Sequence, residues 1–291
     1  MIFETILSIE IVNECKGYKS VKFNSFVSNE SIKDAQDNGI EVLEINEHVH
    51  KLIDYTTMDL VVATDGKWVL PTDSSLLFCN FDVEKLDLSG VDTSKVMDMT
   101  GLFYSCRAKE INMSNFNTTN VEYMRTMFAN CHAEKLDLSS FDTKNVISML
   151  SMFSNCRAKE LNITHFDTSS LTDMGGMFDG CEFDKIDLSN FNTSKVRSMQ
   201  RTFARCKVPK LDLSNFDTSS VVYMEGMFSG CEANEINMSK FDTHNVVNMQ
   251  GMFSGCRAKL LDLRSFRYRP NVGINSMFYK CDADVILSEH N

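Results

Sequence analysis

The sequence predicts an α/β solenoid, a stack of eight coils of 25 residues that each combine a short parallel strand with a short helix. Three observations predict this fold. Eight of the ten cysteines follow one another at regular intervals of 25 residues, from Cys106 to Cys281. The residues before each cysteine repeat almost unchanged, as in "FDTSSVVYMEGMFSGC" (216–231) and "FDTHNVVNMQGMFSGC" (241–256). Within one repeat, the hydrophobic period changes from that of a strand to that of a helix.

The first part of each repeat predicts a short strand. In "KLDLS" (85–89), Leu86 and Leu88 alternate with polar residues, so both leucines face one side and Asp87 faces the other. An Asp or Asn recurs at the position of Asp87. The full set is Asp87, Asn112, Asp137, Asn162, Asp187, Asp212, Asn237 and Asp262. This column predicts a solvated face in which Asn relieves repulsion between like charges; contacts to a cation or a basic ligand are the alternative.

The second part of each repeat predicts a short helix preceded by a capping turn. Its apolar residues fall at the spacing of one stripe on a helix surface. In the first repeat they are Val96, Met99, Leu102, Phe103 and Cys106. Just before them, "DTS" (92–94) supplies side-chain oxygens that can cap a helix start. The Asp or Asn that precedes Thr is therefore expected to make local turn and cap hydrogen bonds.

Near-identical repeats predict columns of identical buried side chains. One coil buries too little apolar surface to offset the entropy of ordering 25 residues, so the coils must stack on one another. A period of this length is typical of leucine-rich and related stacks. The predicted structural core holds a phenylalanine column and a cysteine column. Their members are Phe103, Phe128, Phe153, Phe178, Phe203, Phe228, Phe253 and Phe278, and Cys106, Cys131, Cys156, Cys181, Cys206, Cys231, Cys256 and Cys281.

The cysteine column predicts small buried thiols with neither a metal nor a cofactor. Thiols in a line, about 4.8 Å apart, cannot converge on the tetrahedron that zinc requires. Their Cβ vectors point the same way, which fits disulfide geometry poorly. Occasional oxidation of the thiols and metal binding are the alternatives.

The chain is predicted to divide into four parts. Residues 1–74 do not repeat, and their 6 Lys and Arg against 13 Asp and Glu give a net charge of −7, which predicts an acidic α+β cap. "SNESIKDAQDNG" (28–39) has the start and stop signals of a helix, and Asp65-Gly66 between two β-rich runs predicts a hairpin. Residues 75–81 are a degraded half-coil, 82–281 the eight repeats and 282–291 a C-terminal strand and tail. We expect the C-terminal coil end to be uncovered and open to self-association.

Composition and motifs exclude several classes of function. The net charge of −11 makes the protein a poor ligand for nucleic acid, and no apolar run is long enough for membrane insertion. There is no nucleophile elbow, phosphate loop or zinc spacing, so we expect no enzyme activity, no catalytic residue and no cofactor. The N-terminus lacks the pattern of an export signal, which predicts a cytoplasmic protein. A surface or secreted protein is the alternative if the sequence is trimmed or its export is non-classical.

The candidate partner-binding residues vary from coil to coil although the core does not. Tyr123 and Tyr223 occupy a position that is Asp, Ser or Asn in neighbouring coils. One coil is locally basic through Arg197, Arg201 and Arg205. Exposed tyrosine and arginine are residue types that anchor protein interfaces, although a basic coil can equally be a solvated face.

The string "LDLSNFDTSSVVYMEGMFSGC" (211–231) resembles the repeat of the BspA-like leucine-rich-repeat surface proteins, in particular the type named after mycoplasma lipoproteins. The resemblance covers residues 82–281 and implies a bacterial, protist or viral protein whose relatives are often surface adhesins or host-interaction factors. We therefore expect a non-enzymatic scaffold that presents variable lateral residues to a protein partner. The alternative is a structural protein that assembles end to end, in a virion or a surface layer.

Overall fold

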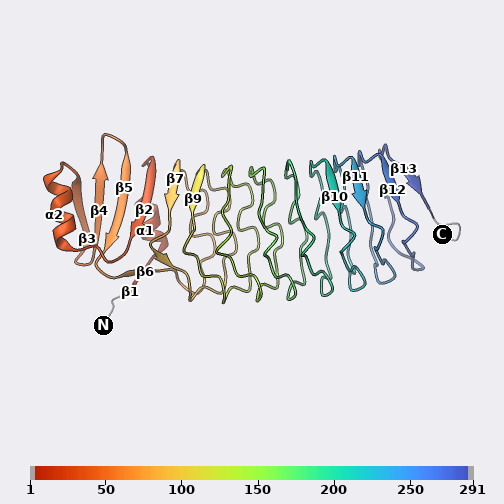
Figure 1. Cartoon of the computed structure of the whole chain (residues 1–291), viewed down its shortest axis with the longest axis horizontal. Coiled ribbons are helices and arrows are strands. Elements are labelled where there is room, and N and C mark those ends of the chain that lie inside the picture. The colour runs from red at the N-terminus through yellow and green to blue at the C-terminus, as the bar shows by residue number, and fades with distance from the viewer. Residues whose placement is uncertain (1–3, 288–291) are drawn as a thin grey trace.

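The computed structural model describes residues 4–287 of the 291-residue chain. The N-terminal residues form one end of an elongated molecule, and the repeats follow one behind another toward the other end (Figure 1). Two short helices, α1 (Ile9–Asn13) and α2 (Asn29–Asp37), lie at the N-terminal end. The strands are β1 (Glu4–Ile6), β2 (Ser20–Asn24), β3 (Glu41–Asn46), β4 (Val49–Asp54), β5 (Asp59–Thr64), β6 (Lys67–Val69), β7 (Lys85–Asp87), β8 (Val91–Asp92), β9 (Glu110–Asn112), β10 (Lys210–Asp212), β11 (Glu235–Asn237), β12 (Leu260–Asp262) and β13 (Asp284–Ile286).

The N-terminal residues and the first repeats share one six-stranded sheet. Its order is β3-β4-β5-β2-β7-β9, in which β3, β4 and β5 are antiparallel neighbours and β2 is parallel to both β5 and β7. The register aligns Val21 of β2 with Leu86 of β7. The ring of Phe23 lies 5.9 Å from that of Trp68 and 6.2 Å from that of Phe78. Both the hydrogen bonding and the apolar core of this end therefore continue into the stack.

Two predictions for this end can be compared with the structure. The predicted helix is confirmed as α2, whose N-cap Ser28 accepts a hydrogen bond from the backbone N–H of Ser31 at 3.2 Å. Gly39 follows the helix with a φ of 82°, as residues that terminate helices often do. The hairpin predicted at Asp65-Gly66 is wrong. Because β4 and β2 already flank β5, β6 leaves that sheet and pairs in parallel with β1 and β8.

Each repeat forms a coil whose backbone bonds to the equivalent position of the next coil. Parallel strand pairs join β7 to β9, β10 to β11 and β12 to β13. Between β9 and β10, one bridge at the strand position joins Leu136 and Leu161. A second ladder of single parallel bridges, which we call the bridge ladder, runs from Asp73 to Gly273 with one residue from each coil. Two rows of backbone contacts therefore hold each coil against the next.

The helix predicted in each coil is not formed, since the described residues after Asp37 contain no helix. A series of turns takes its place. In the first coil, Gly101 and Ser105 have φ values of 61° and 53°, in the left-handed region that a right-handed helix cannot include. Equivalent residues in the following coils have the same sign of φ, for example Thr126 and Asn130.

These turns change where the backbone N–H groups bond. The N–H of Leu102 donates to the carbonyl of Met99 in the same coil at 3.1 Å, whereas the N–H of Phe103 donates to the carbonyl of Met127 in the next coil at 2.9 Å. Alternate N–H groups thus stabilise the turn and the stack. The apolar spacing suggested a helix because these turns also bury residues three and four positions apart. All five apolar residues of the stripe, Val96, Met99, Leu102, Phe103 and Cys106, have no exposed surface.

The predicted core columns are buried along most of the stack. Successive phenylalanine rings from Phe78 to Phe278 are 5.5 to 6.0 Å apart and nearly parallel. The core assignment is wrong for the last coil. Phe278 is 38% exposed and Cys281 is half-buried, because no coil among the described residues lies beyond them.

We expect Phe153→Ala to lower the free energy of unfolding by about 3–5 kcal/mol, because it opens a cavity between two stacked rings. The ring of Phe153 lies 5.7 Å from that of Phe128 and 6.0 Å from that of Phe178. Urea unfolding followed by circular dichroism measures the change. Phe26→Ala is the control, since Phe26 is 57% exposed. A cost below about 1 kcal/mol for Phe153→Ala would contradict the stacked core.

Candidate functional site

Tyr123 and Tyr223 both lie in the bridge ladder, four coils apart. Tyr123 bridges Asp98 and Ser148, and Tyr223 occupies the same position between Ser198 and Asn248. Tyr223 is 44% exposed. Tyr123 is less exposed, and the guanidinium of Arg125 lies 4.6 Å from its ring centroid. Tyr223 therefore offers an open aromatic ring, whereas the ring of Tyr123 is already in a cation–π contact.

Arg201 and Arg205 converge on one carboxylate in the preceding coil. Two guanidinium nitrogens of Arg201 donate to Oδ2 of Asp179 at 3.0 and 3.1 Å, and Nε of Arg205 donates to Oδ1 at 2.9 Å. Asp179 is 7% exposed, so these hydrogen bonds replace most of the water that its carboxylate would otherwise bind. We call this group the Asp179 clamp. Its two arginines join neighbouring coils and are not free surface charges.

Arg197 is exposed and lies in a different environment. It lines a groove of about 640 Å³ formed by successive coils, which we call the basic groove. The residues of the basic groove that matter for its chemistry are Lys195, Arg197, Val222, Asn245, Val247 and Arg269. The backbone N–H of Tyr223 donates to the carbonyl of Arg197 at 3.2 Å. Of the five candidates, Arg197 and Tyr223 are therefore neighbours on adjacent coils, while Arg201 and Arg205 belong to the clamp.

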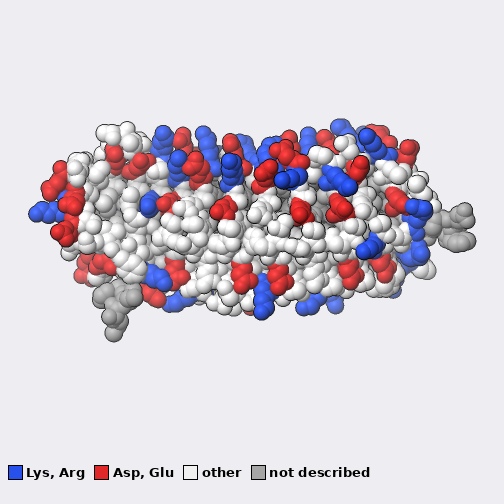
Figure 2. Space-filling view, viewed as in Figure 1, with Lys and Arg blue, Asp and Glu red and all other residues white. Residues whose placement is uncertain are grey.

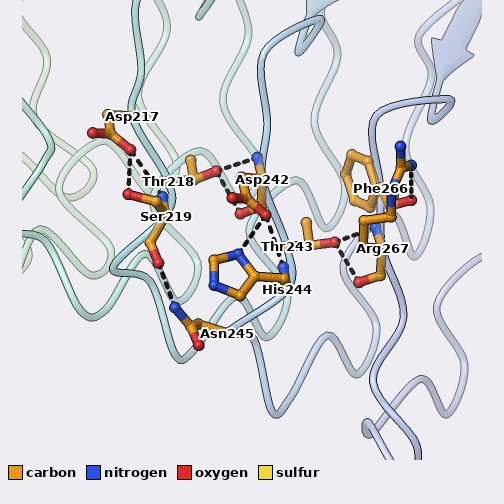
Figure 3. Close-up of polar contacts among 9 residues, drawn as sticks. All are labelled: Asp217, Thr218, Ser219, Asp242, Thr243, His244, Asn245, Phe266 and Arg267. Carbon is orange, nitrogen blue, oxygen red and sulfur yellow. Dashed lines mark hydrogen bonds and ion pairs between the residues drawn. The ribbon is translucent and has the colours of Figure 1, made fainter.

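A threonine ladder fixes the spacing of the coils beside the basic groove. The hydroxyl of Thr218 donates to the carbonyl of Asp242 at 2.8 Å and accepts from the backbone N–H of the same residue at 2.8 Å (Figure 3). Thr243 makes the same pair of bonds to Arg267. The sequence predicts only local bonds here. This role of threonine is not visible in the sequence, because a threonine that caps a turn and one that joins two coils look alike there.

The carboxylate before each threonine makes the predicted turn bonds. The side chain of Asp217 accepts from the backbone N–H of Ser219 at 3.0 Å, and that of Asp242 accepts from the backbone N–H of His244 at 3.0 Å (Figure 3). The His244 N–H lowers the pKa of the Asp242 carboxyl below its ordinary value. These carboxylates are thereby occupied in the backbone turn.

The strand edge of the first five coils carries charges of alternating sign. Lys85, Glu110, Lys135, Glu160 and Lys185 follow one another at the same position of successive coils. Lys85 pairs with Glu110 at 3.1 Å, and Lys210 with Glu235 at 3.7 Å. Figure 2 shows acidic and basic side chains interspersed along this edge, at the top of the view. Exposed pairs of this kind contribute little stability, about 0–1 kcal/mol each.

The outward polar column of the strands also uses its charges locally. The side-chain amide of Asn112 donates to Asp87 at 3.0 Å, and that of Asn237 donates to Asp212 at 2.9 Å. The amides thus replace a repulsion between carboxylates by a hydrogen bond. Within residues 4–287, no group of three or more His, Cys, Asp or Glu side chains is placed to hold a metal ion.

A groove of about 1030 Å³ opens beside Cys156 and Glu182. Phe183 stands where Ala108, Ala133 and Ala158 stand in earlier coils. In the adjoining coils, the N–H of Arg157 and of Lys207 each donates to a cysteine carbonyl of the preceding coil. No such bond joins Glu182 to Cys156 in the described part of the chain. The large ring of Phe183, in a column of smaller side chains, therefore accounts for the missing backbone bond between these two coils. The change of residue type at this position is visible in the sequence.

The cysteines are all free thiols, and seven of the eight column members are buried. Burial raises the pKa of the Cys106, Cys156 and Cys231 thiols to about 12. It raises the pKa of Cys131 and Cys256 to about 11. Protonated thiols are poor nucleophiles and poor metal ligands.

Comparison with known proteins places this architecture among repeat proteins. The profile of the family described as "Mycoplasma protein of unknown function, DUF285" matches residues 72–186 and again residues 177–286. The chain belongs to this family. Neither the curated proteins nor the solved structures contain a match. In the described residues, no helix has the length and apolar character needed to cross a membrane.

The Asp179 clamp should be required for stability, whereas Arg197 should not. We expect Asp179→Asn to cost about 1–2 kcal/mol, because charge-assisted hydrogen bonds to a largely buried carboxylate are lost. Arg197→Glu should change the free energy of unfolding by less than about 0.5 kcal/mol. Urea unfolding measures both, with the exposed Asp184→Asn as the control. Equal stabilities of Asp179→Asn and Asp184→Asn would contradict the clamp.

Buried thiols should make the protein sensitive to alkaline pH. Unfolded thiols ionise near pH 8.5, whereas the folded Cys106 thiol has a pKa of about 12. Above about pH 8.5 the unfolded chain has therefore lost protons that the folded chain keeps, so the free energy of unfolding falls as the pH rises. Urea unfolding between pH 7.5 and 9.5 tests this, and Cys131→Ala should reduce the slope. A stability that does not change over this range would rule out the effect.

Proposed function

We propose that the protein is a non-enzymatic protein-binding scaffold, a leucine-rich-repeat-like solenoid whose lateral surface contacts a partner. The observation that carries this proposal is the bridge ladder, whose backbone repeats in every coil while its side chains change. Its members are Asp73, Asp98, Tyr123, Ser148, Asp173, Ser198, Tyr223, Asn248 and Gly273. Five of these side chains, those of Asp73, Asp98, Ser148, Asp173 and Asn248, accept a hydrogen bond from the backbone N–H two residues further on. Tyr123 and Tyr223 replace such a turn-bonding residue in their coils, and tyrosine is a residue that anchors interfaces.

Arg197 and Tyr223 are the strongest candidates on this surface. They are joined by a backbone hydrogen bond of 3.2 Å, and both are exposed. Arg197 forms no ion pair within the described residues, so its guanidinium is available to a partner. Tyr123 lies in the bridge ladder with Tyr223. The guanidinium groups of Arg201 and Arg205 are less available to a partner, because both already form ion pairs with Asp179.

Membership of a repeat family supports the scaffold proposal. The finer likeness of residues 211–231 to the BspA-like surface proteins supports a role in adhesion or host interaction. Each coil of such a stack adds one more row of exposed side chains, so that a long surface can be matched to a partner without changing the core.

The test begins with cross-linking in cells that produce the protein, identification of the partner by mass spectrometry and purification of that partner. Tyr223→Ala combined with Arg197→Glu should weaken binding of the purified partner by at least about tenfold, since interface anchors of these types each contribute about 2 kcal/mol or more. Biolayer interferometry measures the affinity. The melting curve of the variant should equal that of the parent protein.

Tyr55→Ala combined with Lys185→Glu is the matched control. Tyr55 is 60% exposed at the N-terminal end, and Lys185 is exposed on the strand edge. Unchanged binding by the Tyr223 and Arg197 variant, together with full folding, would refute the lateral surface as the binding site.

A second function, end-to-end assembly, is favoured by the last described coil. Its exposed apolar side chains include Ile274 at 49%, Phe278 at 38% and Leu287 at 50%. Strand β13 pairs only with β12 within the described residues, which leaves one sheet edge open. In this alternative, Val285→Ser, Ile286→Ser and Leu287→Ser would convert an oligomer to a monomer and abolish partner capture, while the Tyr223 and Arg197 variant would retain both.

A further inference from the structure

We propose that the basic groove binds an extended acidic segment of a partner protein, with carboxylates at its first and fifth residues and an apolar side chain at its third. This inference rests on the proposed function and gives the chemistry of the partner at one place on the lateral surface. The groove crosses successive coils, from Thr172 to Arg269, and has a volume of about 640 Å³.

The residues that line the groove carry a net positive charge. Lys195, Arg197 and Arg269 line it, and no Asp or Glu does. Within residues 4–287, none of these three cations has a carboxylate within ion-pair distance. By contrast, Lys95, which stands at the position of Lys195 four coils earlier, bonds to Glu4 at 2.6 Å. In a protein with a net charge of −11, this cluster is a local feature that an anionic group would neutralise.

Most uncharged hydrogen-bonding groups around the groove already have partners. The side-chain amide of Asn245 donates to the carbonyl of Ser219 at 2.7 Å, and the hydroxyl of Ser219 donates to Asp217 at 2.6 Å (Figure 3). The hydroxyl of Ser194 donates to Asn192 at 2.7 Å. The donors left for a ligand are mainly those of the three cations. Arginine forms short, often bidentate hydrogen bonds with carboxylates, so a ligand with carboxylates uses them best.

The spacing of the coils determines the spacing of the carboxylates. Backbone hydrogen bonds of 2.8 to 2.9 Å link Thr172, Arg197, Val222 and Val247 in successive coils. With steps of about 4.8 Å, the coil of Arg269 lies about 14 Å from that of Arg197. An extended peptide advances about 3.4 Å per residue, and its first, third and fifth side chains face the same side. The first and fifth residues therefore span the distance between the two coils that carry the arginines.

The lining also includes two apolar side chains. Val222 and Val247 belong to the two coils between that of Arg197 and that of Arg269, and Val247 is 41% exposed. The third residue of the bound segment would cover these side chains and remove them from water. These apolar side chains favour a peptide over a nucleic acid. None of the residues lining the groove is aromatic, whereas single-stranded nucleic acid is commonly held by aromatic stacking, and the acidic remainder of the protein would repel a longer polyanion.

The experiment uses the full chain and a fluorescein-labelled peptide of sequence GETVTEG, measured by fluorescence anisotropy at low ionic strength. We expect saturable binding that weakens with added salt. Replacing both Glu of the peptide by Gln should reduce the affinity at least about tenfold, as should Arg197→Glu combined with Arg269→Glu in the protein. Moving the two Glu to adjacent positions, with the composition kept, should also weaken binding.

Lys185→Glu combined with Lys240→Glu is the control, because it makes the same change in charge at exposed lysines outside the groove. Arg197→Gln with Arg269→Gln serves as a milder pair if the charge reversal alters the melting curve. Equal binding of the Gln peptide, equal loss in the control, no binding of the Glu peptide, or tighter binding of an oligothymidine of matched length would each overturn the inference. Failure of the peptide with retained sensitivity of the purified partner to Tyr223→Ala would leave the proposed function standing.

Discussion

The whole stack depends on how each coil divides its backbone N–H groups between itself and the next coil. Left-handed residues such as Gly101 and Ser105 turn alternate peptides outward, so that Phe103 donates to Met127 while Leu102 donates within its own turn. These bonds set a constant step, and every side chain then recurs above its equivalent. The parallel rings, the buried thiols and the threonine bonds all follow from that step. Because backbone bonds join the coils at the bridge ladder, Tyr123 and Tyr223 can stand where other coils have an Asp, Ser or Asn that bonds to its own turn.

The sequence predicted the repeat length, the strand position and the buried columns, because each depends on a period that is visible in one dimension. It predicted a helix where the structure has turns. In a helix and in these turns alike, the apolar stripe faces inward, as Met99, Leu102, Phe103 and Cys106 do here. The spacing of apolar residues does not encode the sign of φ, which distinguishes the two conformations. Glycines at 101, 176, 226 and 251 were a usable signal for left-handed turns. The wrong hairpin at Asp65-Gly66 has a different origin, since which sheet receives β6 depends on strands far away in the chain.

The sequence predicted where the candidate binding surface lies. It did not predict which of the candidate residues join neighbouring coils and which are available to a partner. Variable residues at the Tyr123 and Tyr223 position identified an exposed column. Arg201 and Arg205 follow Asp179 by 22 and 26 residues, close to one period, so the sequence places them near Asp179 on the next coil. Whether their side chains reach its carboxylate depends on the three-dimensional structure. The basic groove could not be found in one dimension, because Lys195 and Arg269 come from different coils and only the stack makes them neighbours.

The alternation of charge on the strand edge has a consequence for how so repetitive a chain finds its correct neighbours. Near-identical coils could join out of order, with one coil looped out and its two flanking coils placed in contact, a typical error of repeat proteins. The core columns would hardly oppose this error, because a phenylalanine meets a phenylalanine either way. The edge does oppose it. With one coil omitted, Lys85 would face Lys135 and Glu110 would face Glu160. From Lys85 to Lys185, the sign of the charge thus distinguishes the adjacent coil from the one after it, whereas the alternation ends where Lys210 follows Lys185.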